Sequence, residues 1–292
     1  MGWRVITISS RSKLELKMNY LVVRGEDKTK RIYLDEISTL IIENTGCALT
    51  ASLLEALWKK KINIIFCDSH RNPGAQLLPF NCRFESNTKL FCQIKWDEEI
   101  KNLVWAHIVE QKIRNQAGNL RSINKEVSEK VLSYSFDIQP GDSTNREGHA
   151  AKVYFNALFY PEFSRDMSCF ENAALNYGYA IILSAINRQI VACGYTTQIG
   201  IFHKNTFNQF NLGCDLMEPF RPLVDNIVTK IPISDELSQD SKYELQNLLN
   251  KEVYIDNQIT TVQNAMQIYV YSVLSALDER ELSLIKDYSY EF

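Results

Sequence analysis

The first 68 residues carry the alternating and clustered apolar pattern of β-strands. β-Branched and aromatic residues recur at every second position or in short runs, with turn-forming residues between the runs. The strands expected from this pattern are residues 3–9, 13–18, 20–25, 30–36, 38–44 and 62–68. Residues 51–61 instead have apolar positions at helical spacing. The pattern therefore predicts a small β-rich N-terminal domain with one helix.

A break in this pattern comes after residue 72, where Pro73, Gly74 and Pro79 punctuate a segment without periodicity. From residue 88 onward, apolar residues recur at three- and four-residue spacing, which is typical of helices packed together. The helices expected are residues 97–117, 120–135, 145–160, 167–193, 215–230, 241–252 and 258–284.

We therefore predict an α+β fold in two domains. The domains expected are a β-sandwich-like N-terminal domain over residues 1–72, a linker over residues 73–87, and a larger all-α catalytic domain over residues 88–292.

Composition agrees with two buried cores and excludes several classes of protein. The chain has 292 residues, of which 45% are hydrophobic. It contains no run of the ~18–20 apolar residues that a membrane span needs, and no charged leader followed by a long apolar core. Its seven cysteines include no C-x-x-C pair, which argues against a disulfide framework and a zinc ribbon. We expect a cytoplasmic protein without a membrane partner.

The charge distribution favours metal binding more than simple attraction to nucleic acid. The net charge is −3, whereas nucleic-acid-binding domains are often strongly basic. Residues 1–86 hold 13 Lys or Arg and 9 Asp or Glu, so the remainder of the chain is acidic. DNA contact would then depend on local basic patches or on a partner protein.

The most informative stretch is residues 176–225, which place one histidine and two carboxylates between helical segments. Asp215 and Glu218 are three residues apart, so on a helix their side chains would share one face, with ~5–6 Å between Cβ atoms. We expect this helix to start near Asp215, because Pro219 is tolerated in a first turn. His203 precedes it across a polar loop and could fold back over both carboxylates.

Glu147 adds a carboxylate from an upstream helix, which Ser143 or Thr144 could cap. Carboxylate oxygens and a neutral imidazole suit Mg²⁺ or Mn²⁺ better than a structural zinc. Such a site favours phosphoryl chemistry, because the cation polarises a phosphodiester and stabilises the charge that develops on its oxygens. Spacing alone leaves open the ordinary alternative of a histidine that is only hydrogen-bonded beside solvated acids.

Two arginines stand next to these acidic positions. Arg146 precedes Glu147 and Arg221 follows Glu218 by three residues. Each could grip a phosphate of DNA in a bidentate manner, or could simply neutralise excess carboxylate.

Four long strings of the sequence resemble one known family in order and in separation. They are REGHAAKVYFNALF, NYGYAIILSAINRQIVACGY, GIFHKN and NLGCDLMEPFRPLVD. They resemble the CRISPR-associated spacer-acquisition integrases, the first of the CRISPR-associated proteins. The opening MGWRVITISSRSKLELKMNYLVV is most similar to the versions found in bacterial type II systems.

The resemblance implies a metal-dependent DNA integrase and endonuclease that inserts short foreign DNA segments into a CRISPR array as new spacers. It implies that Glu147, His203 and Glu218 are catalytic residues that hold Mg²⁺ or Mn²⁺. It also implies that Asp215 either contacts one of these ligands without binding the metal itself, or faces DNA.

The resemblance also implies partners. These are double-stranded DNA, as the incoming segment and as the leader and repeat, and a second copy of the chain bound through the N-terminal domain. A dimer of a second, smaller CRISPR-associated protein would bridge two such homodimers into a heterohexamer. The effector nuclease of type II systems and a ring-shaped DNA-end-binding protein would take part as well.

Two other hypotheses remain open from the residues. One is a non-catalytic scaffold that holds DNA ends and whose site has decayed. The other is a general metal-dependent nuclease of repair or recombination, which would share every site residue and differ only in substrate and partner.

Overall fold

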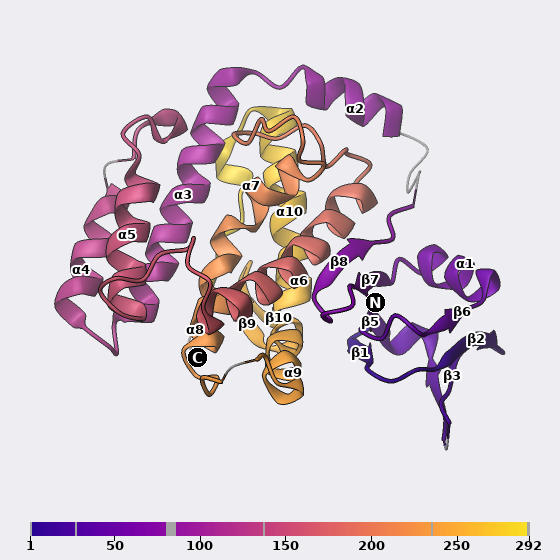
Figure 1. The fold of residues 1–292 in the computed structure, drawn as a ribbon. Helices are drawn as coiled ribbons and strands as arrows, with labels where there is room; N and C mark the ends of the chain where they lie inside the picture. The colour runs from indigo at the N-terminus through magenta and orange to yellow at the C-terminus, as the bar shows by residue number, and fades with distance from the viewer. Residues whose placement is uncertain (1, 27, 80–85, 137, 235, 291–292) are drawn as a thin grey trace. The chain divides into compact units, whose positions relative to one another are not determined.

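The computed structural model describes residues 2–26, 28–79, 86–136, 138–234 and 236–290 (Figure 1). The chain divides into two compact units, residues 1–82 and 83–292. Both helices and strands are present, as expected for an α+β protein.

The N-terminal unit contains two sheets and a helix in its described part. One sheet has the order β1-β5-β7-β8, with β1, β5 and β7 parallel and β8 antiparallel to β7. The other has the order β4-β3-β2-β6 and is antiparallel except where β6 runs parallel to β2. The bounds are β1 Arg4–Ile8, β2 Lys13–Lys17, β3 Tyr20–Arg24, β4 Thr29–Tyr33, η1 Leu34–Glu36, β5 Ile37–Ile42, β6 Ala48–Leu49, α1 Ala51–Lys59, β7 Asn63–Cys67 and β8 Pro73–Gln76.

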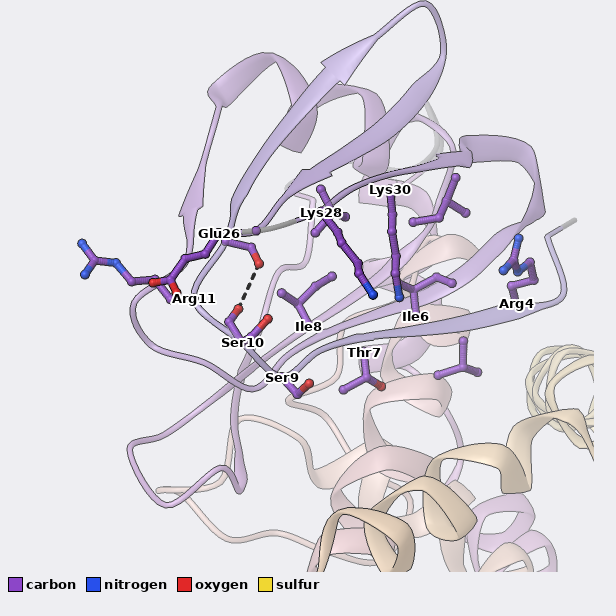
Figure 2. Close-up of a pocket in the computed structure, with 15 residues that line it drawn as sticks. Arg4, Ile6, Thr7, Ile8, Ser9, Ser10, Arg11, Glu26, Lys28 and Lys30 are labelled. Atoms are coloured by element: carbon purple, nitrogen blue, oxygen red, sulfur yellow. Dashed lines mark hydrogen bonds between the residues drawn. The ribbon is translucent and has the colours of Figure 1, made fainter.

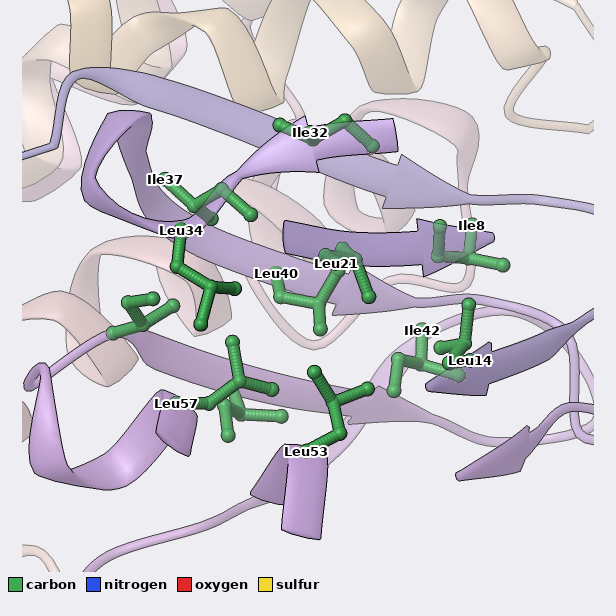
Figure 3. Packing of buried hydrophobic residues seen from close by; sticks show 12 residues of the cluster. Ile8, Leu14, Leu21, Ile32, Leu34, Ile37, Leu40, Ile42, Leu53 and Leu57 are labelled. Carbon is green, nitrogen blue, oxygen red and sulfur yellow. The ribbon is translucent and has the colours of Figure 1, made fainter. Parts of the chain in front are cut away.

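One hydrophobic core joins both sheets of this unit to α1 (Figure 3). Leu40 comes from the first sheet, Leu14 and Leu21 come from the second, and Leu53 and Leu57 come from α1; all five are fully buried. Each such leucine contributes about 1.5–3 kcal/mol relative to an exposed position. Both sheets and α1 therefore bury their apolar side chains in one core.

An open hollow of about 700 Å³ lies beside β1 in the same unit (Figure 2). Arg4, Arg11, Lys28 and Lys30 line it together with one described carboxylate, Glu26. The two lysine side chains extend toward β1 in Figure 2. The hollow therefore has a basic lining.

The C-terminal unit is mainly helical. The α-helices are α2 Ser86–Ile94, α3 Glu98–Leu120, α4 Lys125–Ser133, α5 Arg146–Leu158, α6 Phe170–Ala192, α7 Asn211–Met217, α8 Arg221–Val228, α9 Gln239–Asn247 and α10 Val262–Glu279. The 3-10 turns are η2 Tyr134–Phe136, η3 Pro140–Asp142, η4 Glu218–Phe220, η5 Leu248–Asn250 and η6 Leu282–Leu284. Helix α3 contacts α5, α7, η4 and α8, so it lies at the centre of the elements that carry the predicted site residues (Figure 1).

The prediction of an all-α C-terminal domain is wrong in one respect. A three-stranded antiparallel sheet of order β10-β9-β11 forms from Glu252–Ile255, Gln258–Thr261 and Tyr288–Ser289. Asp256 and Asn257 both have positive φ, at 48° and 62°, which fits a tight hairpin turn between β9 and β10. The helix expected over residues 258–284 therefore begins at Val262, where Thr261 caps it by accepting the N–H of Asn264.

Three local expectations also differ from the structure. The helix expected to start near Asp215 begins at Asn211 instead. The cap of α5 is Asn145, with φ of 54°, rather than Ser143 or Thr144. Within the predicted linker, residues 73–76 form β8, because they can pair with the buried strand β7. Residues 80–85 of that linker lie outside the described residues.

The described cysteines differ in exposure: Cys67 is buried, Cys92 is exposed, and Cys47, Cys169, Cys193 and Cys214 are half-buried. Cys82 lies outside the described residues. None of the helices in the described ranges is both long enough and apolar enough to cross a membrane.

Candidate functional site

The first turn of α5 carries Glu147, as the sequence predicts. The turn is held from both sides. The side chain of Asn145 accepts the N–H of Gly148, and the carboxylate of Asp142 accepts the N–H of Arg146 at 2.7 Å and that of Glu147 at 3.0 Å. Anionic and polar acceptors stabilise a helix start, whose N–H groups have no partner within the helix. The side chain of Glu147 is therefore presented from a fixed turn.

Glu218 lies at a break between two helices. Helix α7 ends at Met217, and Glu218 begins the short turn η4, which includes Pro219. The side chain is buried, with only 4% of its surface exposed. A carboxylate at such a depth requires cationic partners, because burial of an unpaired charge is costly.

Lys112, from the centre of α3, is the main partner of both glutamates. Its Nζ atom lies 2.5 Å from Oε1 of Glu147 and 2.5 Å from Oε2 of Glu218. Arg221 adds an ion pair, with Nε 2.9 Å from Oε1 of Glu218. These four residues, Lys112, Glu147, Glu218 and Arg221, are called the carboxylate cluster below.

The members of the cluster stabilise one another's charged forms. Burial lowers the pKa of Lys112, but attraction to Glu218 and Glu147 outweighs it and the net pKa is raised. Burial raises the pKa of Glu218, but Arg221 and Lys112 outweigh it, so that the pKa lies below its usual value. With both lysine and arginine in place, the two carboxylates are balanced by two cations.

His203 is held by Asp215 rather than by the cluster directly. Nδ1 of His203 lies 2.5 Å from Oδ1 of Asp215, whose carboxylate has no exposed surface. The same carboxylate accepts the N–H groups of Ile201 at 2.6 Å, Phe202 at 3.2 Å and His203 at 3.1 Å. The hydrogen bond that Nδ1 donates to Asp215 raises the pKa of His203, and burial opposes this shift. Glu218 and Glu147 raise the pKa further through space.

This arrangement defines which nitrogen of His203 can react. When Nδ1 donates its proton to Asp215, Nε2 carries a lone pair and is available as a ligand or a base. The rings of Trp105 and His203 meet edge to face at 5.7 Å, and Phe202 stacks on Trp105 at 4.4 Å. The imidazole is thus fixed by a carboxylate and by aromatic packing.

Gly200 allows this loop to approach Asp215. A Cβ atom at this position would lie 2.5 Å from the carbonyl oxygen of His203 and 2.7 Å from Oδ2 of Asp215. Both distances are too short for carbon. Only glycine therefore fits at this point without moving the contact between His203 and Asp215.

The predicted metal ligands have suitable donor chemistry, but a lysine lies between two of them. No three His, Cys, Asp or Glu side chains of the described residues are gathered closely enough, as they stand, to hold a metal ion. Glu147 and Glu218 nevertheless converge on a single cationic atom, Nζ of Lys112. Two carboxylates and a histidine backed by an aspartate are a donor set that a divalent cation accepts. The metal itself stays a prediction.

The other predicted residues take different positions. Asp215 points to the His203 loop instead of sharing one cation with Glu218, and its complete burial leaves no surface for DNA. Arg221 neutralises Glu218. Arg146 is half-buried at the start of α5, where its backbone N–H bonds to Asp142.

Sequence reasoning missed Lys112, although the sequence contains a signal for it. On α3 it lies four residues after Ile108 and three after Val109, both of which are fully buried. It therefore occupies the apolar face of its helix. A lysine in that position needs an anionic partner from a facing element.

Arg221 packs against a buried network formed by Tyr154, Tyr179 and Asp225. The ring of Tyr179 lies 4.7 Å from the guanidinium, and the hydroxyls of Tyr179 and Tyr154 donate to Asp225 at 2.5 and 3.0 Å. Burial raises the pKa of Asp225 to about 6, although the two tyrosine hydroxyls and Arg221 oppose this shift. The network joins α5, α6 and α8 beneath the cluster.

Tyr288 of β11 supports the turn that carries Glu218. Its hydroxyl donates to the carbonyl oxygen of Pro219 at 2.5 Å, and its ring stacks on Phe220 at 4.4 Å. Asn115 of α3 donates to the same carbonyl at 3.0 Å. The residue after Glu218 is thus fixed from two elements.

Comparisons with known proteins point to one family. The family described as CRISPR associated protein Cas1 matches residues 5–260. Over its whole length the chain is 32% identical to the CRISPR-associated endonuclease Cas1 of Neisseria meningitidis serogroup C, and it covers 100% of that relative. It is 25% identical to CRISPR-associated endonuclease Cas1 1 of Francisella tularensis subsp. novicida, with 82% of each chain covered.

Solved structures share the fold at lower identity. A casposase bound to integration product has a TM-score of 0.77 at 18% identity, covering 97% of this chain and 92% of the other. A CAS1 protein from Thermotoga maritima has a TM-score of 0.76 at 17% identity, covering 97% and 98%. The chain of a Cas6-RT-Cas1–Cas2 complex has a TM-score of 0.74 at 16% identity, covering 100% of this chain and 36% of the other.

Proposed function

The chain belongs to the family of the CRISPR-associated protein Cas1, and on that basis we propose that it is a metal-dependent DNA integrase with endonuclease activity. Its reaction would insert short foreign DNA segments into a CRISPR array as new spacers. The observation that carries this proposal is the convergence of Glu147 and Glu218 on one cationic position, beside a histidine held by a buried aspartate.

The proposed reaction exchanges one phosphodiester for another. The 3′-hydroxyl oxygen of the incoming segment attacks a phosphorus at the edge of a repeat and forms a new P–O bond. The attacking hydroxyl loses its proton. The bond from the phosphorus to the 3′ oxygen of the flanking nucleotide breaks, and that leaving oxygen takes up a proton. Since one phosphodiester replaces another, no external energy source is needed. Water in place of the hydroxyl would give hydrolysis, which explains an endonuclease activity of the same site.

Glu147, His203 and Glu218 would hold Mg²⁺ or Mn²⁺. The cation, when bound, supplies Lewis-acid polarisation of the phosphate and offsets the charge that develops in the transition state. Asp215 keeps the Nδ1 proton of His203 directed at itself, so that Nε2 is the nitrogen left to act as a ligand. The rigid mounting of Glu147 and Glu218 fixes the position of the reacting phosphate, and such orientation lowers the barrier.

We propose DNA and protein partners on the same basis. The substrates are double-stranded DNA, as the incoming segment and as the leader and repeat. Two copies of the chain would pair through the N-terminal unit, and a dimer of a small second protein would bridge two pairs into a heterohexamer. Similar solved structures include a casposase bound to integration product and a Cas6-RT-Cas1–Cas2 complex, which supports both kinds of partner. The effector nuclease and a ring-shaped end-binding protein would act with them in the bacterial cytoplasm.

Strand transfer of a labelled short duplex into a plasmid bearing a leader and repeat tests the proposal. The assay contains Mn²⁺ and the small partner protein, and compares the wild type with Glu218→Ala and His203→Ala. Exposed residues of the same types supply the controls, Glu244→Ala and His70→Ala. We expect transfer with the wild type and both controls, and a loss of at least ~100-fold in the two site variants.

Two outcomes would favour the other hypotheses. DNA-end binding without transfer in any form of the protein indicates a non-catalytic scaffold. Metal-dependent cleavage of any duplex, without joining and without preference for the repeat, indicates a general nuclease.

A further inference from the structure

Lys112 occupies a position that a divalent cation would need. Its ammonium is within 2.5 Å of one oxygen of Glu147 and one oxygen of Glu218, and 9% of its side chain is exposed. A Mg²⁺ ion binds carboxylate oxygens at ~2.0–2.1 Å. A cation shared by these two oxygens would therefore overlap the ammonium group.

The charge balance of the carboxylate cluster leads to the same conclusion. Lys112 and Arg221 already balance Glu147 and Glu218. A divalent cation added to this buried, balanced set would create an excess of two positive charges where solvent screens weakly. The affinity for the divalent cation rises if one positively charged side chain moves away from the carboxylates, or if a negatively charged group binds nearby.

Lys112 is better suited to leave than Arg221. The guanidinium of Arg221 also packs over the ring of Tyr179, within a buried network. Among the described residues, the Lys112 ammonium bonds to Glu147 and Glu218. A lysine has four flexible carbons and three rotatable donors, and it binds phosphate as a point charge.

We propose that Lys112 is the resident counter-ion of the site: it holds Glu147 and Glu218 before a divalent cation binds, and transfers to a DNA phosphate when the cation displaces it. This inference rests on the proposed function. A DNA phosphate accepts the ammonium that the cation displaces, so bound DNA raises the affinity of the site for the cation. Because such coupling is reciprocal, the bound cation raises the affinity for DNA by the same factor. Without DNA the site would load metal poorly, which would limit hydrolysis of other targets.

The test measures Mn²⁺ affinity in the absence of DNA, by electron paramagnetic resonance of the free ion. It compares the wild type with Lys112→Met, Lys112→Arg and Arg114→Gln. Arg114 lies two residues further along α3, where it pairs with the surface residue Glu110, so Arg114→Gln removes a charge from the same helix away from the cluster. We expect Lys112→Met to bind Mn²⁺ at least ~10-fold more tightly, which corresponds to ~1.4 kcal/mol. Lys112→Arg should bind no more tightly than the wild type, and Arg114→Gln should equal it.

A double variant locates the gain in affinity. Lys112→Met combined with Glu218→Gln should lose the tight Mn²⁺ site. Tight binding that survives in the double variant would place the ion elsewhere and would overturn the proposal.

A second measurement uses the wild type and does not depend on the folding of any variant. Acetylation of lysines by acetic anhydride is followed at Lys112 by mass spectrometry, with and without saturating Mn²⁺. We expect Lys112 to be protected without Mn²⁺ and to react faster with it, while the exposed Lys125 reacts equally in both. Unchanged protection at saturating Mn²⁺ would overturn the exchange.

The outcomes separate this inference from the proposed function. Equal Mn²⁺ affinity in the wild type and a folded Lys112→Met overturns only the role of Lys112. Failure of every form to bind Mn²⁺, together with an absence of metal-dependent strand transfer, overturns the proposed metal site and this inference with it.

Discussion

The imidazole of His203 and the carboxylate of Asp215 form a pair in which the aspartate is completely buried and the histidine is partly exposed. The aspartate also accepts three backbone N–H groups. It therefore shapes the loop and orients the ring at once. Its replacement should affect stability and chemistry together.

Asp215→Asn tests this pair. The amide can accept through one oxygen only, and its NH₂ group would face N–H donors. We expect the free energy of unfolding to fall by about 1–3 kcal/mol, and strand transfer to fall ~10–100-fold. Urea unfolding and the transfer assay measure the two effects. The control Asp240→Asn changes an exposed aspartate at the start of α9 and should leave both unchanged. A fully active Asp215→Asn would contradict the assigned role.

Gly200→Ala tests the close approach of the loop to Asp215. The added methyl would overlap the carbonyl of His203 and the carboxylate, so the loop must shift. We expect a loss of about 1–3 kcal/mol in the free energy of unfolding and a clear loss of transfer. Gly118→Ala is the matched control, because nothing lies within 4 Å of its added carbon.

Gly118 lies in α3, where alanine is favoured over glycine by up to ~1 kcal/mol. The control should therefore be slightly more stable than the wild type. Equal effects of the two glycine substitutions would show that crowding at Gly200 is not the cause.

The pH dependence of stability should report on Asp225. Its pKa is about 6 in the folded protein against 3.8 as the reference value. The folded state thus binds the proton more tightly, so this carboxyl lowers the free energy of unfolding as pH rises through that interval. Between pH 5 and 7 we expect the wild type to lose about 1 kcal/mol relative to Asp225→Asn.

Urea unfolding at several pH values measures this difference. The groups around the carboxyl are Tyr154, Tyr179 and Arg221, of which none titrates in that range by itself. Asp166→Asn, at an exposed position, should follow the wild type at every pH. A difference between wild type and Asp225→Asn that does not vary with pH would refute the prediction.

Removal of metal should stop the reaction without unfolding the protein. A chelator should abolish strand transfer, and added Mn²⁺ or Mg²⁺ should restore it. Because Lys112 and Arg221 balance the carboxylates, the melting temperature should change little. Circular dichroism with and without chelator measures this. A large fall in melting temperature would mean that the fold itself depends on a metal.

Sequence patterns predict the structure correctly where a feature depends on one helix or strand alone. Residues 51–61 were expected to be helical, and α1 forms there because Leu53 and Leu57 bury on one face and Thr50 caps the start. Glu147 was placed on a first turn correctly for the same local reason. Such features depend on neighbours within one or two turns.

Features that depend on distant partners were missed. The strand β10 was included in the long helix expected over residues 258–284, and β9 was not expected as a strand. The third strand of their sheet, β11, lies over 25 residues beyond β10. The partnership of Lys112 with Glu147 and Glu218 spans 35 and 106 residues. No local sequence pattern predicts where the two glutamates lie relative to α3.

The contact between Tyr288 and the carbonyl of Pro219 has a consequence for synthesis of the protein. The turn carrying Glu218 receives this support from a residue made 69 positions later. A nascent chain whose helices α3, α5 and α7 have already left the ribosome would still lack the contact from Tyr288. The site would therefore mature only after Tyr288 has left the ribosome, which delays any action on cellular DNA until that point.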